Sequence, residues 1–87
     1  MTNNFLTVTK LYKILSDISK RSCDTLNPNE DLFALGVLDS FGIVEFVVTL
    51  EKNLNLKIPQ EDLIPQNFLS INAIYNMLER LRMDSNS

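Results

Sequence analysis

Apolar residues recur at three- and four-residue intervals near both ends of the chain, a spacing that gathers side chains on one face of a helix. The first such stretch predicts a helix from about Thr7 to Lys20. The second predicts a helix that starts after Ser70, a good N-cap residue, and fades into a polar, flexible tail at about residues 84–87. The apolar positions are Val8, Leu11, Ile14, Leu15 and Ile18 in the first helix, and Ile71, Ile74, Tyr75, Leu78 and Leu81 in the last.

A middle helix is predicted from about Ser40 to Asn53, with Asp39 or Ser40 as its N-cap. At about 100° per residue, its apolar side chains fall on two opposite faces. A bundle of this size cannot bury both faces fully, so we expect the narrower face to be exposed. The wider face holds Ile43, Phe46, Val47, Leu50 and Leu54, and the narrower face holds Phe41, Val44 and Val48.

Charged residues border the narrower face of this helix. Glu45, Glu51 and Lys52 supply the rim. An exposed apolar patch with a charged rim is typical of a site where a partner protein docks. The alternative is that the apolar connection at residues 21–39 folds over this face and buries it.

The connection at residues 21–39 combines turn formers, at 27–29 and at Gly36, with several large apolar residues. Such a segment must pack against the core. We therefore expect an ordered loop with a short helical turn near Glu30 to Leu35.

The segment after the middle helix should be extended just before Pro59, because the residue preceding a proline avoids the helical conformation. A short third helix is predicted from Gln60 to Ile64, with Pro65 as its stop. No alternating strand pattern of useful length occurs. The prediction is therefore a single all-α domain over residues 1–87, a four-helix bundle with a long ordered loop between its first two helices.

The composition narrows the possible functions. With 45% hydrophobic and 22% charged residues in 87, the chain is typical of one soluble globular domain. A net charge of −3 with scattered basic residues argues against nucleic-acid binding. The chain has no histidine, which removes the usual partner for metal binding or for activating a nucleophile. Its single cysteine, Cys23, cannot form an intramolecular disulfide, and we expect it to be a small buried residue. Without a targeting segment or a membrane span, a cytoplasmic location is expected.

The start of the middle helix carries the candidate chemistry. Asp39 and Ser40 are an ordinary capping pair at first sight. However, a serine at a helix N-terminus is also a good attachment point for a phosphodiester, because the backbone N–H groups and the helix dipole favour an anion there. No base that could activate Ser40 is visible, so we expect no catalytic residue, and any modification must come from another enzyme.

The segment 31–46 (DLFALGVLDSFGIVEF), followed by Leu50-Glu51 and by the run 56–59 (LKIP), resembles the acyl carrier protein family. By this resemblance, Ser40 accepts a 4'-phosphopantetheine arm, and Asp39 helps a carrier protein synthase (a phosphopantetheinyl transferase) to bind. Phe41, Val44 and Val48 then match the family's apolar docking positions, with Glu45 and Glu51 as acidic contacts. The chain departs from fatty-acid carriers at Gly42 and Lys52, where acids are common, and is closer to D-alanyl and peptidyl carriers.

The resemblance implies a carrier and not an enzyme. Such a protein holds an acyl or aminoacyl group as a thioester on its arm and presents it to biosynthetic enzymes. The expected partners are the synthase, a cargo-loading ligase or adenylating enzyme, and an acyltransferase or other biosynthetic enzymes. We expect the chain to be a monomer that binds no metal and no nucleic acid and does not insert into a membrane. The alternative is a small helical interaction module without a prosthetic group, in which Ser40 is only part of a cap.

Overall fold

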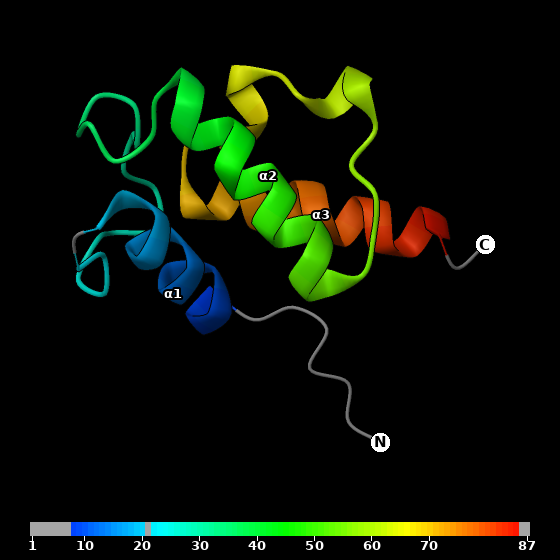
Figure 1. Cartoon of the computed structure of the whole chain (residues 1–87), viewed down its shortest axis with the longest axis horizontal. Coiled ribbons are helices and arrows are strands. Elements are labelled where there is room, and N and C mark those ends of the chain that lie inside the picture. The colour runs from blue at the N-terminus through cyan, green and yellow to red at the C-terminus, as the bar shows by residue number, and fades with distance from the viewer. Residues whose placement is uncertain (1–7, 21, 86–87) are drawn as a thin grey trace.

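The computed structural model describes residues 8–20 and 22–85 of the chain. Within these ranges it contains three α-helices, two short 3₁₀ segments and no strand, so the all-α class is confirmed (Figure 1). The elements are α1 (Val8–Ser19), α2 (Ser40–Leu54), η1 (Gln60–Asp62), η2 (Pro65–Phe68) and α3 (Ile71–Ser85). α1 packs against both α2 and α3, and η2 packs against α3.

The short third helix that the sequence predicts is replaced by the two 3₁₀ segments. η1 ends at Asp62, where the Leu63 N–H donates to the carbonyl of Gln60 at 3.0 Å. Pro65, expected to stop a helix, instead begins η2, since a proline is tolerated at a first helical position where its missing N–H is not needed. The structure therefore has three α-helices in its described part, where four were predicted.

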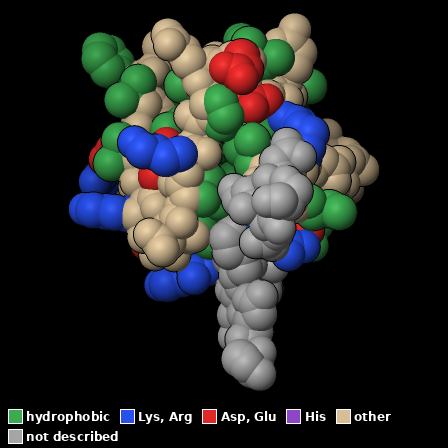
Figure 2. All heavy atoms as spheres, turned by 90° about the vertical axis from the view of Figure 1, so that its right-hand side faces the viewer, with side chains coloured by type: hydrophobic (Ala, Val, Ile, Leu, Met, Phe, Trp, Pro, Cys, Tyr) green, Lys and Arg blue, Asp and Glu red, His purple; other side chains and the backbone are tan. Residues whose placement is uncertain are grey.

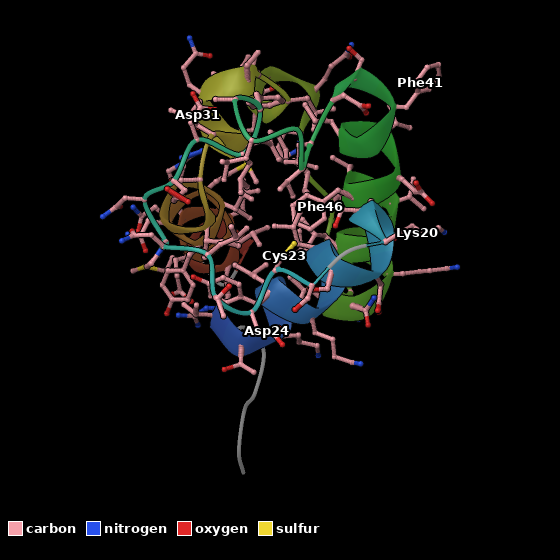
Figure 3. All side chains as sticks on the ribbon, turned by 90° about the vertical axis from the view of Figure 1, so that its left-hand side faces the viewer. Lys20, Cys23, Asp24, Asp31, Phe41 and Phe46 are labelled. Carbon is pink, nitrogen blue, oxygen red and sulfur yellow. The ribbon has the colours of Figure 1, made fainter. Side chains whose placement is uncertain are left out.

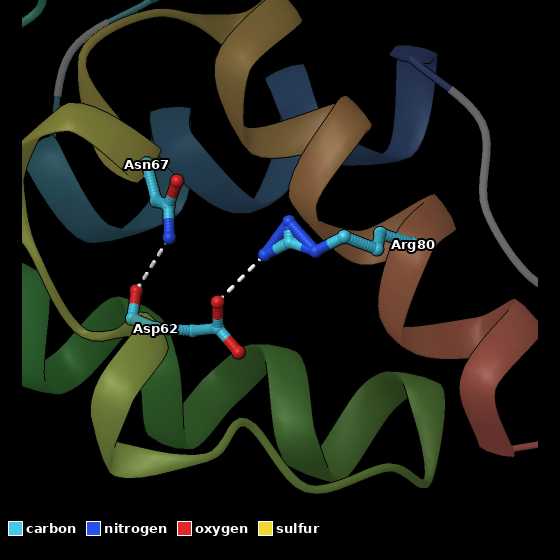
Figure 4. A network of polar contacts seen from close by, with 3 residues as sticks. All are labelled: Asp62, Asn67 and Arg80. Carbon is cyan, nitrogen blue, oxygen red and sulfur yellow. Dashed lines mark hydrogen bonds and ion pairs between the residues drawn. The ribbon is translucent and has the colours of Figure 1, made fainter.

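Polar contacts fix this 3₁₀ region onto α3 (Figure 4). The Asp62 carboxylate accepts a hydrogen bond from Arg80 Nη2 at 2.6 Å, and the Asp62 carbonyl accepts one from Asn67 Nδ2 at 2.8 Å. One residue thus joins η1 to both η2 and α3. This ion pair is partly exposed, so we expect it to orient the segment more than to stabilise the fold.

The helix ends agree closely with the sequence pattern. Thr7, the predicted start of the first helix, lies outside the described residues. α2 ends at Asn55, whose left-handed conformation (φ 54°) closes the helix. The Ser70 hydroxyl accepts the Ala73 N–H at 3.1 Å and so caps α3, as predicted. α3 runs through Ser85, which lies within the segment predicted as a tail, and residues 86–87 lie outside the described residues.

The segment between α1 and α2 is tied to the start of α3. The Leu32 N–H donates to the carbonyl of Leu69 at 2.8 Å, and the Asn72 N–H donates to the carbonyl of Pro28 at 3.0 Å. A single turn occurs where a short helical turn was expected, with the Leu35 N–H bonded to the Asp31 carbonyl at 3.1 Å. The turn is followed by Gly36 at φ 75°, a left-handed conformation that favours glycine.

One buried apolar cluster joins α1, α2, α3, η2 and the segment between α1 and α2. Phe46 of α2 and Phe68 of η2 meet edge to face at its centre, with ring centroids 6.4 Å apart. Cys23 is fully buried in the same cluster, as expected for a small apolar residue. This core holds α2 by one face and leaves its first turn at the molecular surface.

Candidate functional site at the start of α2

Asp39 caps α2, which settles which of the two candidate residues takes that role. Its backbone is extended, and its Oδ1 accepts the N–H of Gly42 at 2.7 Å. Its carbonyl accepts the N–H of Ile43 at 2.9 Å and so makes the first hydrogen bond of the helix. Ser40 is therefore the first residue of α2, and its side chain does not cap the helix.

Gly42 allows this cap to close tightly. A Cβ atom at this position would lie 3.2 Å from Asp39 Oδ1 and 3.5 Å from Leu38 Cδ2. The first of these distances is tight, so a side chain at this position would require the Asp39 carboxylate to shift by a few tenths of an ångström.

The Ser40 side chain is exposed, and its hydroxyl makes no hydrogen bond within the described part of the chain. The N–H groups of Ser40 and Phe41 precede the first intrahelical hydrogen bond and have no partner inside the helix. Together with the helix dipole they make this end of α2 favourable for a negatively charged group. An exposed hydroxyl beside unpaired N–H groups fits a residue that carries a phosphodiester.

In the part of the chain that the structure describes, no base is hydrogen-bonded to this hydroxyl. The Asp39 carboxylate is engaged with the Gly42 N–H, and the chain contains no histidine. Among residues 8–20 and 22–85, no group of three potential metal-ligating side chains occurs.

The narrower face of α2 forms an exposed apolar ridge, hereafter the α2 ridge (Phe41, Val44 and Val48). These side chains are 87%, 63% and 52% exposed, respectively. Figure 3 shows the Phe41 ring pointing away from the molecule at the start of α2, while Phe46 of the same helix points into the interior. The predicted exposure of this face is confirmed, and the alternative that residues 21–39 cover it is wrong.

The two acids predicted to border the α2 ridge differ in their surroundings. Glu45 is exposed, and its carboxylate has no hydrogen bond or ion pair with the described residues. The Glu51 carboxylate accepts the N–H of Ile58 at 2.8 Å and so fastens the chain that follows α2. Glu45 can serve a partner without cost to the fold, whereas Glu51 already has a structural role.

Sequence reasoning missed two residues next to this surface. After the turn at Asn55, the chain brings Leu56 and Lys57 alongside Val48 and Lys52, where they line a shallow groove. In the structure, the chain reverses at Asn55, which has a left-handed backbone conformation. In the sequence, the signal for this reversal is an asparagine directly after an apolar helical pattern.

Elsewhere on the surface, a hollow of about 860 Å³ lies along α1, with Tyr12, Lys13 and Ser16 among its lining residues. On the face shown in Figure 2, lysine and arginine side chains form separate groups (blue) and no continuous basic patch. No helix in the part of the chain that the structure describes is long and apolar enough to cross a membrane. We take the start of α2 and the α2 ridge as the candidate site because the exposed Ser40 and the exposed apolar side chains lie there.

The described part of the chain is thus an all-α fold with an exposed serine at the first position of its second helix, beside an apolar ridge. Residues 9–78 match the family model described as a phosphopantetheine attachment site, so the chain belongs to this family. It is 29% identical over 73 residues to the D-alanyl carrier protein of Bacillus licheniformis, covering 84% of this chain and 94% of the relative. Identity to the D-alanyl carrier proteins of Streptococcus pyogenes serotype M5 and Streptococcus equi subsp. zooepidemicus is 39% over 54 residues, covering 62% of this chain and 68% of each relative.

Membership in this family establishes the general function. The chain is a carrier protein with a covalently attached 4'-phosphopantetheine, and it works with partner enzymes. It is a carrier and not an enzyme, because the reactive chemistry belongs to the prosthetic group. The interpretation as an interaction module without a prosthetic group is set aside.

Proposed function

We propose that this chain is an aminoacyl carrier of the D-alanyl type and that Ser40 is the residue that holds the arm. The observation that carries the assignment to Ser40 is its exposed hydroxyl at the first position of α2. This hydroxyl makes no hydrogen bond to the described part of the protein. The D-alanyl cargo is supported by the names of the matching relatives. When bound, the arm supplies a terminal thiol that holds the cargo as a thioester.

The residues of the chain itself attach, orient and present the arm. Asp39 fixes the first turn of α2 and so sets the direction of the Ser40 side chain, and its carboxylate also serves recognition by the carrier protein synthase. The unpaired N–H groups at this helix end favour the phosphodiester. No residue here takes or gives a proton to the cargo.

The docking surface is the α2 ridge together with Glu45 and Glu51. We assign to it the carrier protein synthase, a cargo-loading ligase or adenylating enzyme, and an acyltransferase or other biosynthetic enzyme. An apolar centre with a charged rim suits complexes that must form and separate repeatedly. Because Glu51 also binds the Ile58 N–H, Glu45 is the acid available for partner contact at no cost to stability.

The proposal extends to the protein as a whole. Residues 1–87 act as a single carrier domain and a monomer, in which η1 and η2 stand in place of the third helix of a four-helix carrier bundle and residues 21–39 form the ordered loop. The cytoplasm is the expected location, since a reducing compartment keeps the thiol of the arm available.

Two measurements test the proposed function in sequence. Co-expression with a carrier protein synthase should add one phosphopantetheine group to the parent protein and to Ser22→Ala, and none to Ser40→Ala, as read by intact mass. The modified protein should then accept D-alanine from an adenylating ligase with ATP, and L-alanine much less. Modification of Ser40→Ala would refute the attachment site, and loading of a different acid in preference to D-alanine would refute the cargo.

The Ser40→Ala variant should be folded, which makes its failure informative. Asp39, and not Ser40, provides the capping hydrogen bond. Alanine is also a good helix former, so we expect a change in stability of less than about 0.5 kcal/mol.

A further inference from the structure

A shallow groove lies at the C-terminal end of α2, opposite to the end that carries Ser40. Its volume is about 390 Å³, and its lining residues are Val48, Glu51, Lys52, Asn55, Leu56 and Lys57. Val48 and Leu56 are its apolar lining residues, and Val48 is also the last member of the α2 ridge. A partner that covers the whole ridge must therefore also reach this groove.

The rim of the groove is basic. Lys52 and Lys57 are exposed, and neither makes an ion pair with the residues that the structure describes. Glu51, the acid of this groove, accepts the N–H of Ile58 and keeps its negative charge, so the two lysines outnumber a single acid at the rim. Lys52 lies in the last turn of α2, where a cation favours the helix dipole, but Lys57 lies beyond the helix and gains nothing from it.

The charges along the α2 ridge consequently change sign. Glu45 and Lys52 are seven residues apart, which places them on the same side of the helix at a separation of about 10 Å along its axis. This separation is comparable to the Debye length of about 10 Å at 0.1 M ionic strength. A partner therefore meets an acidic group near Ser40 and a separate basic group beyond Val48, and not a single averaged charge.

We propose, on the basis of the carrier function above, that the cargo-loading enzyme docks on this surface with a complementary bipolar pattern. A lysine or arginine of the partner faces Glu45, an apolar side chain enters the groove between Val48 and Leu56, and an aspartate or glutamate faces Lys52 and Lys57. A uniformly basic docking surface, which would suit a carrier with an acidic helix, is repelled at the groove. The lysines thus select the partner as well as attract it.

The test uses the phosphopantetheine-bearing protein and the D-alanine-activating ligase of the same organism. Lys52→Glu and Lys57→Glu are compared with Lys13→Glu, which makes the same change of charge at an exposed position on α1. We expect the groove variants to lower kcat/KM for loading about three- to tenfold at low salt, through KM, while Lys13→Glu stays close to the parent. The loss should shrink toward about 1 M salt, where the Debye length is about 3 Å.

A pattern-reversed variant, Glu45→Lys with Lys52→Glu, keeps the net charge and exchanges the two signs. It should lose more activity than either single substitution, which separates the charge pattern from the total charge. Circular dichroism confirms that each variant is folded, and intact mass confirms that each carries the arm before loading is measured.

The outcomes are distinct. An unchanged kcat/KM for Lys52→Glu and Lys57→Glu overturns the proposal, and an increase shows that the partner surface is uniformly basic. If the parent protein is not modified, or is modified and not loaded with D-alanine, the proposed function fails and this inference fails with it. If the parent protein is loaded normally and only the groove variants are loaded more slowly, the bipolar interface is supported.

Discussion

The two faces of α2 perform different tasks with similar residues. Phe46 and Leu50 are fully buried, whereas Phe41 of the α2 ridge is 87% exposed. Both faces are apolar, so hydrophobicity alone does not distinguish core from binding surface. The difference lies in what the rest of the chain covers, since an apolar face that the fold leaves exposed is available to a partner. Substitutions on one face should therefore change stability, and those on the other should change transfer.

The largest effect on stability is expected at the buried face. Leu50→Ala leaves a cavity in the core and should lower the free energy of unfolding by about 2–5 kcal/mol, which is a large part of the stability of a small domain. Val48→Ala, on the ridge, should cost less than about 1 kcal/mol. Urea unfolding of both variants measures the two values, and equal losses would show that the ridge is part of the core.

The largest effect on transfer is expected at the exposed face. Val44→Asp places a charge at the centre of the docking surface, where it must be desolvated, and should reduce loading by more than about tenfold. The helical circular dichroism signal of the isolated protein should hardly change. Val8→Asp, the same substitution at an exposed position on α1, is the control. Loading of Val44→Asp at the rate of the parent would place the docking face elsewhere.

Asp39 caps α2 and is also a proposed contact of the carrier protein synthase, and two substitutions can separate these roles. Asp39→Ala removes the hydrogen bond to the Gly42 N–H and should cost about 0.5–2 kcal/mol of stability. Asp39→Asn keeps a capping oxygen and removes only the charge, so its stability should stay near that of the parent. If Asp39 is also recognised by the synthase, both variants are modified slowly. Normal modification of Asp39→Asn would limit Asp39 to its capping role.

The two acids beside the ridge allow a smaller version of the same comparison. Glu51→Ala leaves the buried N–H of Ile58 without its acceptor and should lower stability by about 1–2 kcal/mol. Glu45→Ala should leave stability unchanged and slow partner association moderately, with a loss that decreases as salt rises. Chemical unfolding and loading rates at two salt concentrations distinguish these variants. Equal stability of both would remove the structural role of Glu51.

The sequence predicts α2 well because its two faces follow directly from helical geometry. The periodicity also predicts α1 and α3, and the side-chain chemistry predicts the cap at Ser70. These features depend on neighbours within a few residues. The exposure of the α2 ridge follows from the size of the chain, which cannot cover a second apolar face.

The remaining features depend on contacts between distant segments. The replacement of a third helix by η1 and η2 is tied to Asp62, which binds Arg80 of α3 and Asn67 of η2. The bond between Glu51 and Ile58 requires the reversal at Asn55. Neither pairing has a periodic signal in the sequence. This is why Glu51 was predicted as a partner contact and its structural role was not.

The central claim is that the exposed start of α2 carries the arm at Ser40, and one measurement tests it without altering the protein. After co-expression with a carrier protein synthase, the protein is digested with a protease that cleaves after lysine and arginine. Cleavage after Arg21 and Lys52 then releases a single peptide of residues 22–52, because no other lysine or arginine lies between them. Fragmentation of this peptide in the mass spectrometer locates the modified residue among Ser22, Thr25, Ser40 and Thr49. We predict phosphopantetheine on Ser40 alone. An arm on any other residue, or an unmodified peptide, would contradict the account.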